Sequence, residues 1–159
     1  MSSAMGAPSR VHVIANSQST QALRIADSVD AGLRSHGIDT SRESDESEKV
    51  SFGTRELTGE PRLTATDLIL VIGGDGTMLR AAEVGRDSGA AILGVNLGHV
   101  GFLAEAEEED VQSVIDAIAG GQWSVEERLA LDVIVSRDSL VVDRTWALNE
   151  VSVEKHARE

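Results

Sequence analysis

The sequence predicts an α/β protein, in which a doubly wound parallel sheet forms an N-terminal domain and the start of an all-β domain follows. Strand-like apolar runs alternate with amphipathic helical runs along most of the chain. Two of the strand-like runs, 67–74 and 90–96, are almost entirely apolar, as strands covered on both faces are. After residue 122 apolar and polar residues begin to alternate, which is typical of antiparallel strands. We therefore expect domains at 1–122 and 123–159, with the second incomplete.

The first strand is expected at 10–16 and the first helix at 19–37. Ser19 or Thr20 can cap the start of this helix, and Gly37 suits its end. The helical spacing of five apolar residues predicts the buried stripe: Ala22, Ile25, Ala26, Val29 and Leu33. Between Ile38 and Thr66 the pattern becomes polar and charged, so we expect a loop there, with at most a short strand near 49–53.

The remaining elements follow in the same way. A helix at 77–89 joins the strands at 67–74 and 90–96, and an amphipathic helix is expected at 108–121. The later part of the chain predicts a strand at 128–136 with Leu129, Leu131, Val133 and Val135 facing inward, a turn at 137–139, and further β structure at 140–155.

Composition excludes several classes of function. The chain of 159 residues has 27 acidic and 14 basic residues, a formal charge of −13, which opposes binding to nucleic acid. It contains no cysteine, which excludes thiol chemistry and fits a reducing compartment. No apolar run is long enough to span a bilayer, and no secretory signal is evident. These observations predict a cytoplasmic protein that binds neither nucleic acid nor membrane.

A glycine-rich segment, GGDGT at 73–77, lies between the strand at 67–74 and the helix that follows it. Gly73, Gly74 and Gly76 permit positive φ angles and allow a ligand to approach backbone N–H groups closely. Thr77 can cap the helix or bind a phosphate oxygen, and Arg80 should flank the same site. A tight turn is the simpler explanation, but three glycines at a strand–helix junction favour a phosphate site.

The carboxylate of Asp75 would repel phosphate unless it has a function there. Two functions fit: Asp75 binds a Mg²⁺ ion that bridges phosphate oxygens, or it accepts the proton of an attacking hydroxyl group. The residues alone do not decide between them.

Two further motifs can contribute to a site. GVNLGHVGFLAE (94–105) follows another buried strand, and its Asn96 and Phe102 could contact a ligand, although a crossover with Phe102 in the core explains it too. ALNEVSVEK (147–155) places Asn149 and Glu150 inside an apolar run. That pair could bind ribose hydroxyls and a base edge, or belong to an exposed edge strand. The histidines show no metal-ligand spacing, so we predict no protein-bound metal centre.

The three motifs together, in this order and spacing, resemble bacterial NAD kinases over residues 67–155. The resemblance implies a fold shared with phosphofructokinases. It also implies transfer of a phosphoryl group from ATP, or from inorganic polyphosphate, to the 2′-hydroxyl of the adenosine ribose of NAD, which gives NADP, with Mg²⁺ as the divalent metal. Asp75 matches the catalytic acid–base residue of the family, so the resemblance favours the base over the metal ligand.

The resemblance also implies nucleotide contacts for Gly76 and Arg80, and Gly74 and Thr77 stay candidates from the motif itself. In addition, it implies contacts for Phe102, Asn149 and Glu150, and Asn96 stays a candidate from the second motif. Full-length members are expected to be homo-oligomers, dimers or tetramers. The family continues with a β-rich domain beyond the residues here, so we expect this chain alone to turn over NAD weakly or not at all. Two rivals remain: a diacylglycerol-like lipid kinase, which shares GGDGT, and a non-catalytic nucleotide-binding module.

Overall fold

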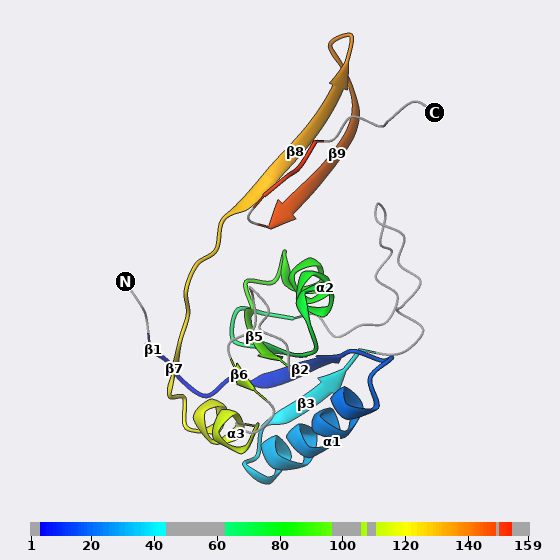
Figure 1. Ribbon diagram of the computed structural model, residues 1–159. Helices are drawn as coiled ribbons and strands as arrows, with labels where there is room; N and C mark the ends of the chain where they lie inside the picture. Colours follow the sequence, from blue (N-terminus) through cyan, green and yellow to red (C-terminus); the bar gives the residue numbers. More distant parts are fainter. Residues whose placement is uncertain (1–3, 44–62, 97–105, 108–110, 149, 154–159) are drawn as a thin grey trace. The chain divides into compact units, whose positions relative to one another are not determined.

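The structure is a computed structural model that describes residues 4–43, 63–96, 106–107, 111–148 and 150–153. The chain divides into two compact units, 1–125 and 126–159 (Figure 1). Within the described ranges, no helix is both long and apolar enough to cross a lipid bilayer.

A five-stranded parallel sheet is the centre of the first unit, with the strand order β3-β2-β4-β5-β6. Its strands are β2 (Arg10–Ala15), β3 (Asp39–Arg42), β4 (Leu68–Ile72), β5 (Ala91–Asn96) and β6 (Ala106–Glu107). A separate antiparallel pair joins β1 (Ala4–Met5) to β7 (Trp123–Ser124). Trp123 therefore pairs within the first unit and packs against its core. That residues from 123 onward begin a separate β domain stays a prediction.

Helices cover both faces of the parallel sheet. Helices α1 (Thr20–Ser35) and α3 (Val111–Ala119) lie on one face, and α2 (Asp75–Gly85) lies on the other (Figure 1). This arrangement confirms the predicted α/β class with a parallel, doubly covered sheet.

The order of the strands creates a switch point between β2 and β4. The chain leaves β2 through α1 and adds β3 on one side, whereas it leaves β4 through α2 and adds β5 on the other. Right-handed crossovers in opposite directions place α1 and α2 on opposite faces. The chain segments that follow β2 and β4 therefore diverge, and a crevice between such segments is the usual ligand site of an open α/β sheet.

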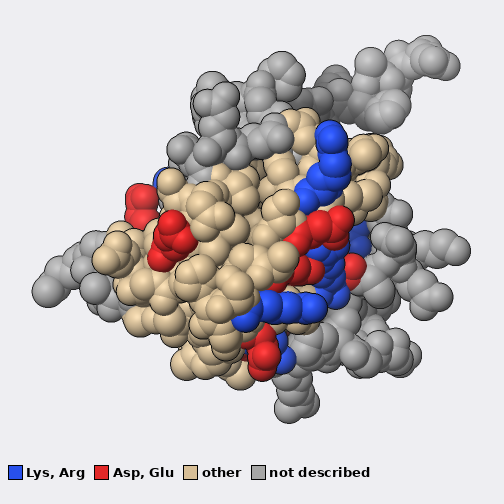
Figure 2. All heavy atoms as spheres, turned by 90° about the horizontal axis from the view of Figure 1, so that it is seen from below, with Lys and Arg blue, Asp and Glu red and all other residues tan. Residues whose placement is uncertain are grey.

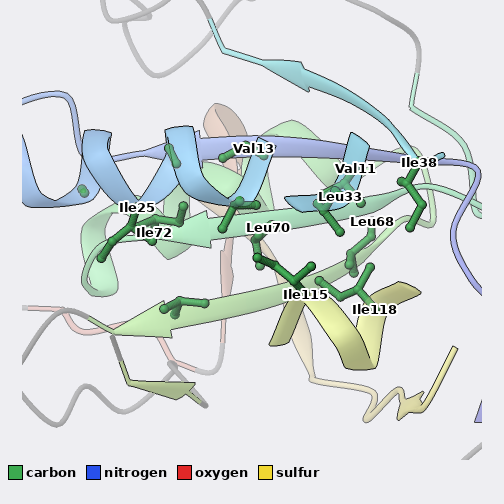
Figure 3. Close-up of a cluster of buried hydrophobic side chains, with 14 residues drawn as sticks. Val11, Val13, Ile25, Leu33, Ile38, Leu68, Leu70, Ile72, Ile115 and Ile118 are labelled. Carbon is green, nitrogen blue, oxygen red and sulfur yellow. The ribbon is translucent and has the colours of Figure 1, made fainter. Parts of the chain in front are cut away.

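The larger core lies between the sheet and the pair α1 and α3 (Figure 3). Ile115 and Ile118 of α3 lie against apolar side chains of the strands. The five stripe residues predicted for the first helix are all buried. Every residue of β4 is buried, as predicted for a strand covered on both faces.

The smaller core lies on the opposite face. Met78 and Ala81 of α2 pack against Ile14 of β2 and against Ile69 and Val71 of β4. This contact fixes the start of α2 beside the carboxyl ends of β2 and β4, which is where the candidate site forms.

A buried ion pair joins β2 and β4 at their amino ends. Arg10 Nη2 lies 2.8 Å from Asp67 Oδ2, and the Asp67 side chain is only 3% exposed. The Thr64 N–H and hydroxyl groups donate to the same oxygen at 2.8 and 3.1 Å. Burial raises the pKa of Asp67, but the hydrogen bonds from Arg10 and Thr64 outweigh it and hold the pKa below its usual value.

The structure corrects three expected boundaries. A strand, β3, occupies part of the expected loop, and the two-residue strand β6, which was not expected, pairs with β5. Helix α2 begins at Asp75 rather than at Thr77, so Gly74 is the N-cap and Thr77 lies in the first turn. The strand considered near 49–53 lies outside the described residues.

The polar strand β3 (DTSR) is stabilised by contacts that its own sequence does not show. It pairs in parallel with β2, and Arg42 forms ion pairs with Asp27 and Asp30 of α1.

On the face that Figure 2 shows, basic side chains lie beside acidic ones, so the described residues form no broad basic patch there.

The second unit contains one described hairpin. Strands β8 (Ala130–Arg137) and β9 (Leu140–Leu148) are antiparallel, and Asp138 and Ser139 form the turn with φ angles of 51° and 67°. Of the four residues expected to face inward, Leu131 and Val133 are half-buried, but Leu129 and Val135 are exposed. The expected strand at 140–155 ends at Leu148.

Candidate functional site: a pocket at the switch point

A pocket lies where β2 and β4 diverge, as the strand order predicts. Its volume is about 180 Å³. The end of β2 contributes Ala15, Asn16 and Ser17, and α2 contributes Gly76, Thr77 and Arg80. The structure thus places three of the residues predicted from the GGDGT motif around one cavity.

The two helices that begin at this edge of the sheet differ in their capping. Ser19 caps α1, because its hydroxyl oxygen accepts the Ala22 N–H at 3.2 Å. The N-cap of α2 is Gly74, and none of the described side chains caps this helix. The first intrahelical bond of α2 runs from the Met78 N–H to the Gly74 carbonyl oxygen, at 3.1 Å. The N–H groups at the start of α2 are therefore available to an anion.

The glycines of the motif act through their size rather than through positive φ angles. None of the three has a positive φ, which corrects one reason given for them. A Cβ atom on Gly73 would lie 2.5 Å from Thr77 Oγ1 and 3.4 Å from Asn16 Cβ, so Gly73 lets these two residues approach. A Cβ atom on Gly74 or Gly76 meets nothing within 4 Å. The described part of the chain does not require glycine there, whereas a close ligand would.

Asn16 is a pocket residue that the sequence analysis did not identify. Its N–H donates to the Ile72 carbonyl oxygen at 2.9 Å, which ties the end of β2 to the end of β4. Its side-chain oxygen accepts the Gln18 N–H at 3.0 Å. The signal in the sequence was a polar residue directly after the first strand. This residue can be assigned to the pocket only once the position of β2 beside β4 is known.

The charges around the pocket have both signs. Arg80 lines the pocket, is about one-third exposed, and pairs with Glu43 through Nε and Oε2 at 2.9 Å. Asp75 is the first residue of α2 and is exposed beside Gly76. The positive end of the helix dipole favours a carboxylate at this position. Asp75 is neither buried nor hydrogen-bonded by a described side chain, so it is accessible to a ligand.

The described residues supply no ready-made metal centre. No three His, Asp or Glu side chains among them lie close enough to hold an ion. A Mg²⁺ ion beside Asp75 would need phosphate oxygens and waters to complete its coordination, which is how Mg²⁺ usually binds with nucleotides.

Several predicted site residues fall elsewhere. Asn96 ends β5, at the same edge of the sheet as the pocket, but its side chain lies outside the described residues. Phe102 and Asn149 also lie outside them. Glu150 belongs to the second unit, where it is exposed and its N–H donates to the Leu148 carbonyl oxygen at 2.9 Å.

The sequence and fold match known proteins. The chain is 42% identical over 153 residues to NAD kinase 2 of Streptomyces coelicolor, covering 94% of this chain and 51% of that one. It is 53% identical over 92 residues to the NAD kinase of Mycobacterium bovis, which covers 58% of this chain and 30% of that protein. The chain thus spans about half, or less, of the length of these curated relatives.

A solved structure shares the fold. Yeast NADH kinase, crystallised with NADH, superposes with a TM-score of 0.65 at 19% sequence identity, covering 88% of this chain and 47% of the yeast chain. Residues 7–123 match the family described as ATP-NAD kinase N-terminal domain. Because the matched segment makes up most of the chain, this protein belongs to the ATP-NAD kinase family.

Proposed function

We propose that this chain carries the phosphate-binding part of an NAD kinase, which phosphorylates the 2′-hydroxyl of the adenosine ribose of NAD to give NADP. The uncapped start of α2, open to a pocket at the switch point, is the observation that carries the proposal. Relatives at 42% and 53% identity are named NAD kinases. They support this function over a diacylglycerol-like lipid kinase.

The phosphoryl donor, ATP or polyphosphate, brings its anionic chain to the start of α2. The N–H groups near Gly74 and Gly76 donate to phosphate oxygens, Thr77 offers a hydroxyl group, and Arg80 supplies positive charge. Mg²⁺ enters with the donor as part of the substrate and neutralises phosphate charge.

Asp75 acts as the general base. Its carboxylate accepts the proton of the ribose 2′-hydroxyl while the hydroxyl oxygen attacks the terminal phosphorus, and the bond from that phosphorus to the leaving phosphate breaks. Exposure beside the pocket leaves the carboxylate accessible to such a hydroxyl group. Asn96 and Phe102, and Asn149 with Glu150 of the second unit, are proposed to bind the dinucleotide.

The test is detection of NADP by mass spectrometry after incubation with NAD and either MgATP or polyphosphate. Because the chain spans about half of its Streptomyces relative, the same assay is run on a fusion of this chain to the remaining half of that protein. We expect weak turnover by the chain alone and clear turnover by the fusion, with diacylglycerol not accepted. In the fusion, Asp75→Asn should lower the rate by about 10²–10⁴-fold and leave ATP affinity unchanged.

A binding module would give the opposite result. It would bind nucleotide without forming NADP, and Asp75→Asn would not change its nucleotide affinity. If the fusion with Asn at this position keeps its rate, the base assignment is wrong.

We further propose that the protein is cytoplasmic and forms a homo-oligomer through its β-rich part. Leu140, Val141 and Val142 of β9 are 71%, 64% and 55% exposed. Three consecutive apolar side chains exposed to this degree favour association. Light scattering after size-exclusion chromatography tests this, and a monomer at high concentration would contradict it.

A further inference from the structure

The ion pair between Glu43 and Arg80 is unusual because it places a carboxylate beside a proposed phosphate site. Glu43 directly follows β3, and its N–H donates to the Val13 carbonyl oxygen at 3.3 Å. Its side chain is only 10% exposed. The backbone of Glu43 is thus fixed to β2, and its side chain is held against α2.

The contact uses only one part of the guanidinium group. In this ion pair, Glu43 Oε2 lies 2.9 Å from Arg80 Nε. An arginine has five N–H donors, and four of them are on the two terminal Nη atoms. Among the described residues, Glu43 is the ion-pair partner that the structure gives Arg80, so the Nη donors remain for an acceptor in the pocket that Arg80 lines.

We propose that Glu43 is a positioning residue: it holds Arg80 through Nε so that the two Nη groups face the pocket and donate to phosphate oxygens. This inference rests on the proposed function and adds a residue to that site. Ordering a long arginine side chain before the ligand arrives removes part of the entropy cost of binding. The carboxylate has an opposing effect, because its charge repels phosphate.

Two substitutions separate these effects. Glu43→Gln keeps an oxygen that can accept the Arg80 Nε–H and removes the negative charge. Glu43→Ala removes both. The probe is inorganic triphosphate with Mg²⁺, titrated calorimetrically into the 159-residue chain. We expect Glu43→Ala to weaken binding by about threefold to tenfold, the range for ordering one long side chain. We expect Glu43→Gln to bind as well as the wild type or more tightly.

A double-mutant cycle excludes an indirect effect on the fold. If Glu43 acts through Arg80, Glu43→Ala should have no further effect in an Arg80→Ala background. The NMR signal of the Arg80 Nε–H group gives a second readout. The hydrogen of this group should exchange slowly with water in the wild type and in Glu43→Gln, and rapidly in Glu43→Ala. In the wild type, exchange should stay slow when triphosphate is saturating.

Each other outcome has a distinct meaning. If both Glu43 variants bind triphosphate more tightly than the wild type, Glu43 competes with the ligand and the inference is wrong. If Arg80→Ala weakens binding but neither Glu43 variant changes it, the inference fails and the proposed function stands. If the wild-type chain binds no triphosphate, both the proposed phosphate site and this inference are overturned.

Discussion

Replacing Gly76 with alanine should change stability and ligand binding in opposite directions. Gly76 is the second residue of α2, and a Cβ atom built on it meets nothing within 4 Å. Alanine favours a helix over glycine by up to about 1 kcal/mol. Gly76→Ala should therefore raise the free energy of unfolding by up to that amount, a rise in Tm of about 2–4 °C for a chain of this size.

Triphosphate binding should weaken in the same variant. Gly76 lines the pocket, so the added methyl group occupies space that a phosphate oxygen needs to reach the N–H groups of α2. Losing one charge-assisted hydrogen bond costs about 1.5–3 kcal/mol, which corresponds to at least about tenfold in affinity. Calorimetric titration with Mg²⁺ and triphosphate measures this loss. Far-UV circular dichroism, which reports on helices α1, α2 and α3, measures Tm.

Gly73→Ala is the matched control, since it adds the same methyl group three residues earlier. Here the Cβ atom would lie 2.5 Å from Thr77 Oγ1 and 3.0 Å from Thr77 Cβ. Overpacking of this kind costs about 1–3 kcal/mol, so Tm should fall by about 2–12 °C. A Gly76→Ala chain that binds triphosphate as well as the wild type would refute the proposed approach of phosphate to α2.

Four further substitutions concern stability. Asp67→Asn should lower the free energy of unfolding by about 1–3 kcal/mol at neutral pH. The pKa of Asp67 is lowered in the folded chain from 3.8, so its contribution is fully present above that value and is lost as the pH falls through the folded pKa. Urea titrations at a series of pH values should show the two chains converging in acid, and a constant difference would contradict this. Gly37→Ala should lower the free energy of unfolding by about 1–2 kcal/mol, because φ at this residue is 78°. A Cβ atom there would meet no atom of the described residues within 4 Å, so the φ angle is the sole cause of this cost. Gly121→Ala should cost more, because its φ is 65° and the Cβ atom would also lie 2.9 Å from the Ala7 nitrogen; equal Tm values for the two variants would exclude that clash. Ser139→Gly should stabilise the β8–β9 hairpin by about 1 kcal/mol, since Ser139 has a φ of 67°, and amide hydrogen exchange that is no slower would show that the turn is unstrained.

The elements that the sequence predicted well are those whose residues face the core. The stripe from Ala22 to Leu33 is periodic because a helix turns the same side toward the sheet every three or four residues. The strand at 68–72 is apolar throughout because both of its faces are covered. In these segments the spacing of apolar residues reflects which side chains are buried, so the sequence alone predicts where each element lies and whether it is a helix or a strand.

The elements that the sequence did not predict depend on distant partners. Strand β3 is polar and exists through its pairing with β2 and the contacts of Arg42. Helix α2 begins two residues earlier than expected, because Gly74 serves as its N-cap although glycine has no side chain that could cap the helix. The pocket residue Asn16 and the Arg80 partner Glu43 directly follow β2 and β3, and the order of these strands in the sheet cannot be read along the chain.

The position of Asp75 has two sufficient physical reasons. A carboxylate at the first position of a helix is stabilised by the helix dipole, by about 0.3–1 kcal/mol, whether or not a ligand binds. The proposed base needs the same position, because the attacking hydroxyl group would approach a phosphate bound at the start of α2. Dipole stabilisation alone does not require an uncapped helix start, glycines with open space above them, and an arginine one turn further along. A bound anion would explain these three features together, and the carboxylate of Asp75 would then lie where the proposed base is needed.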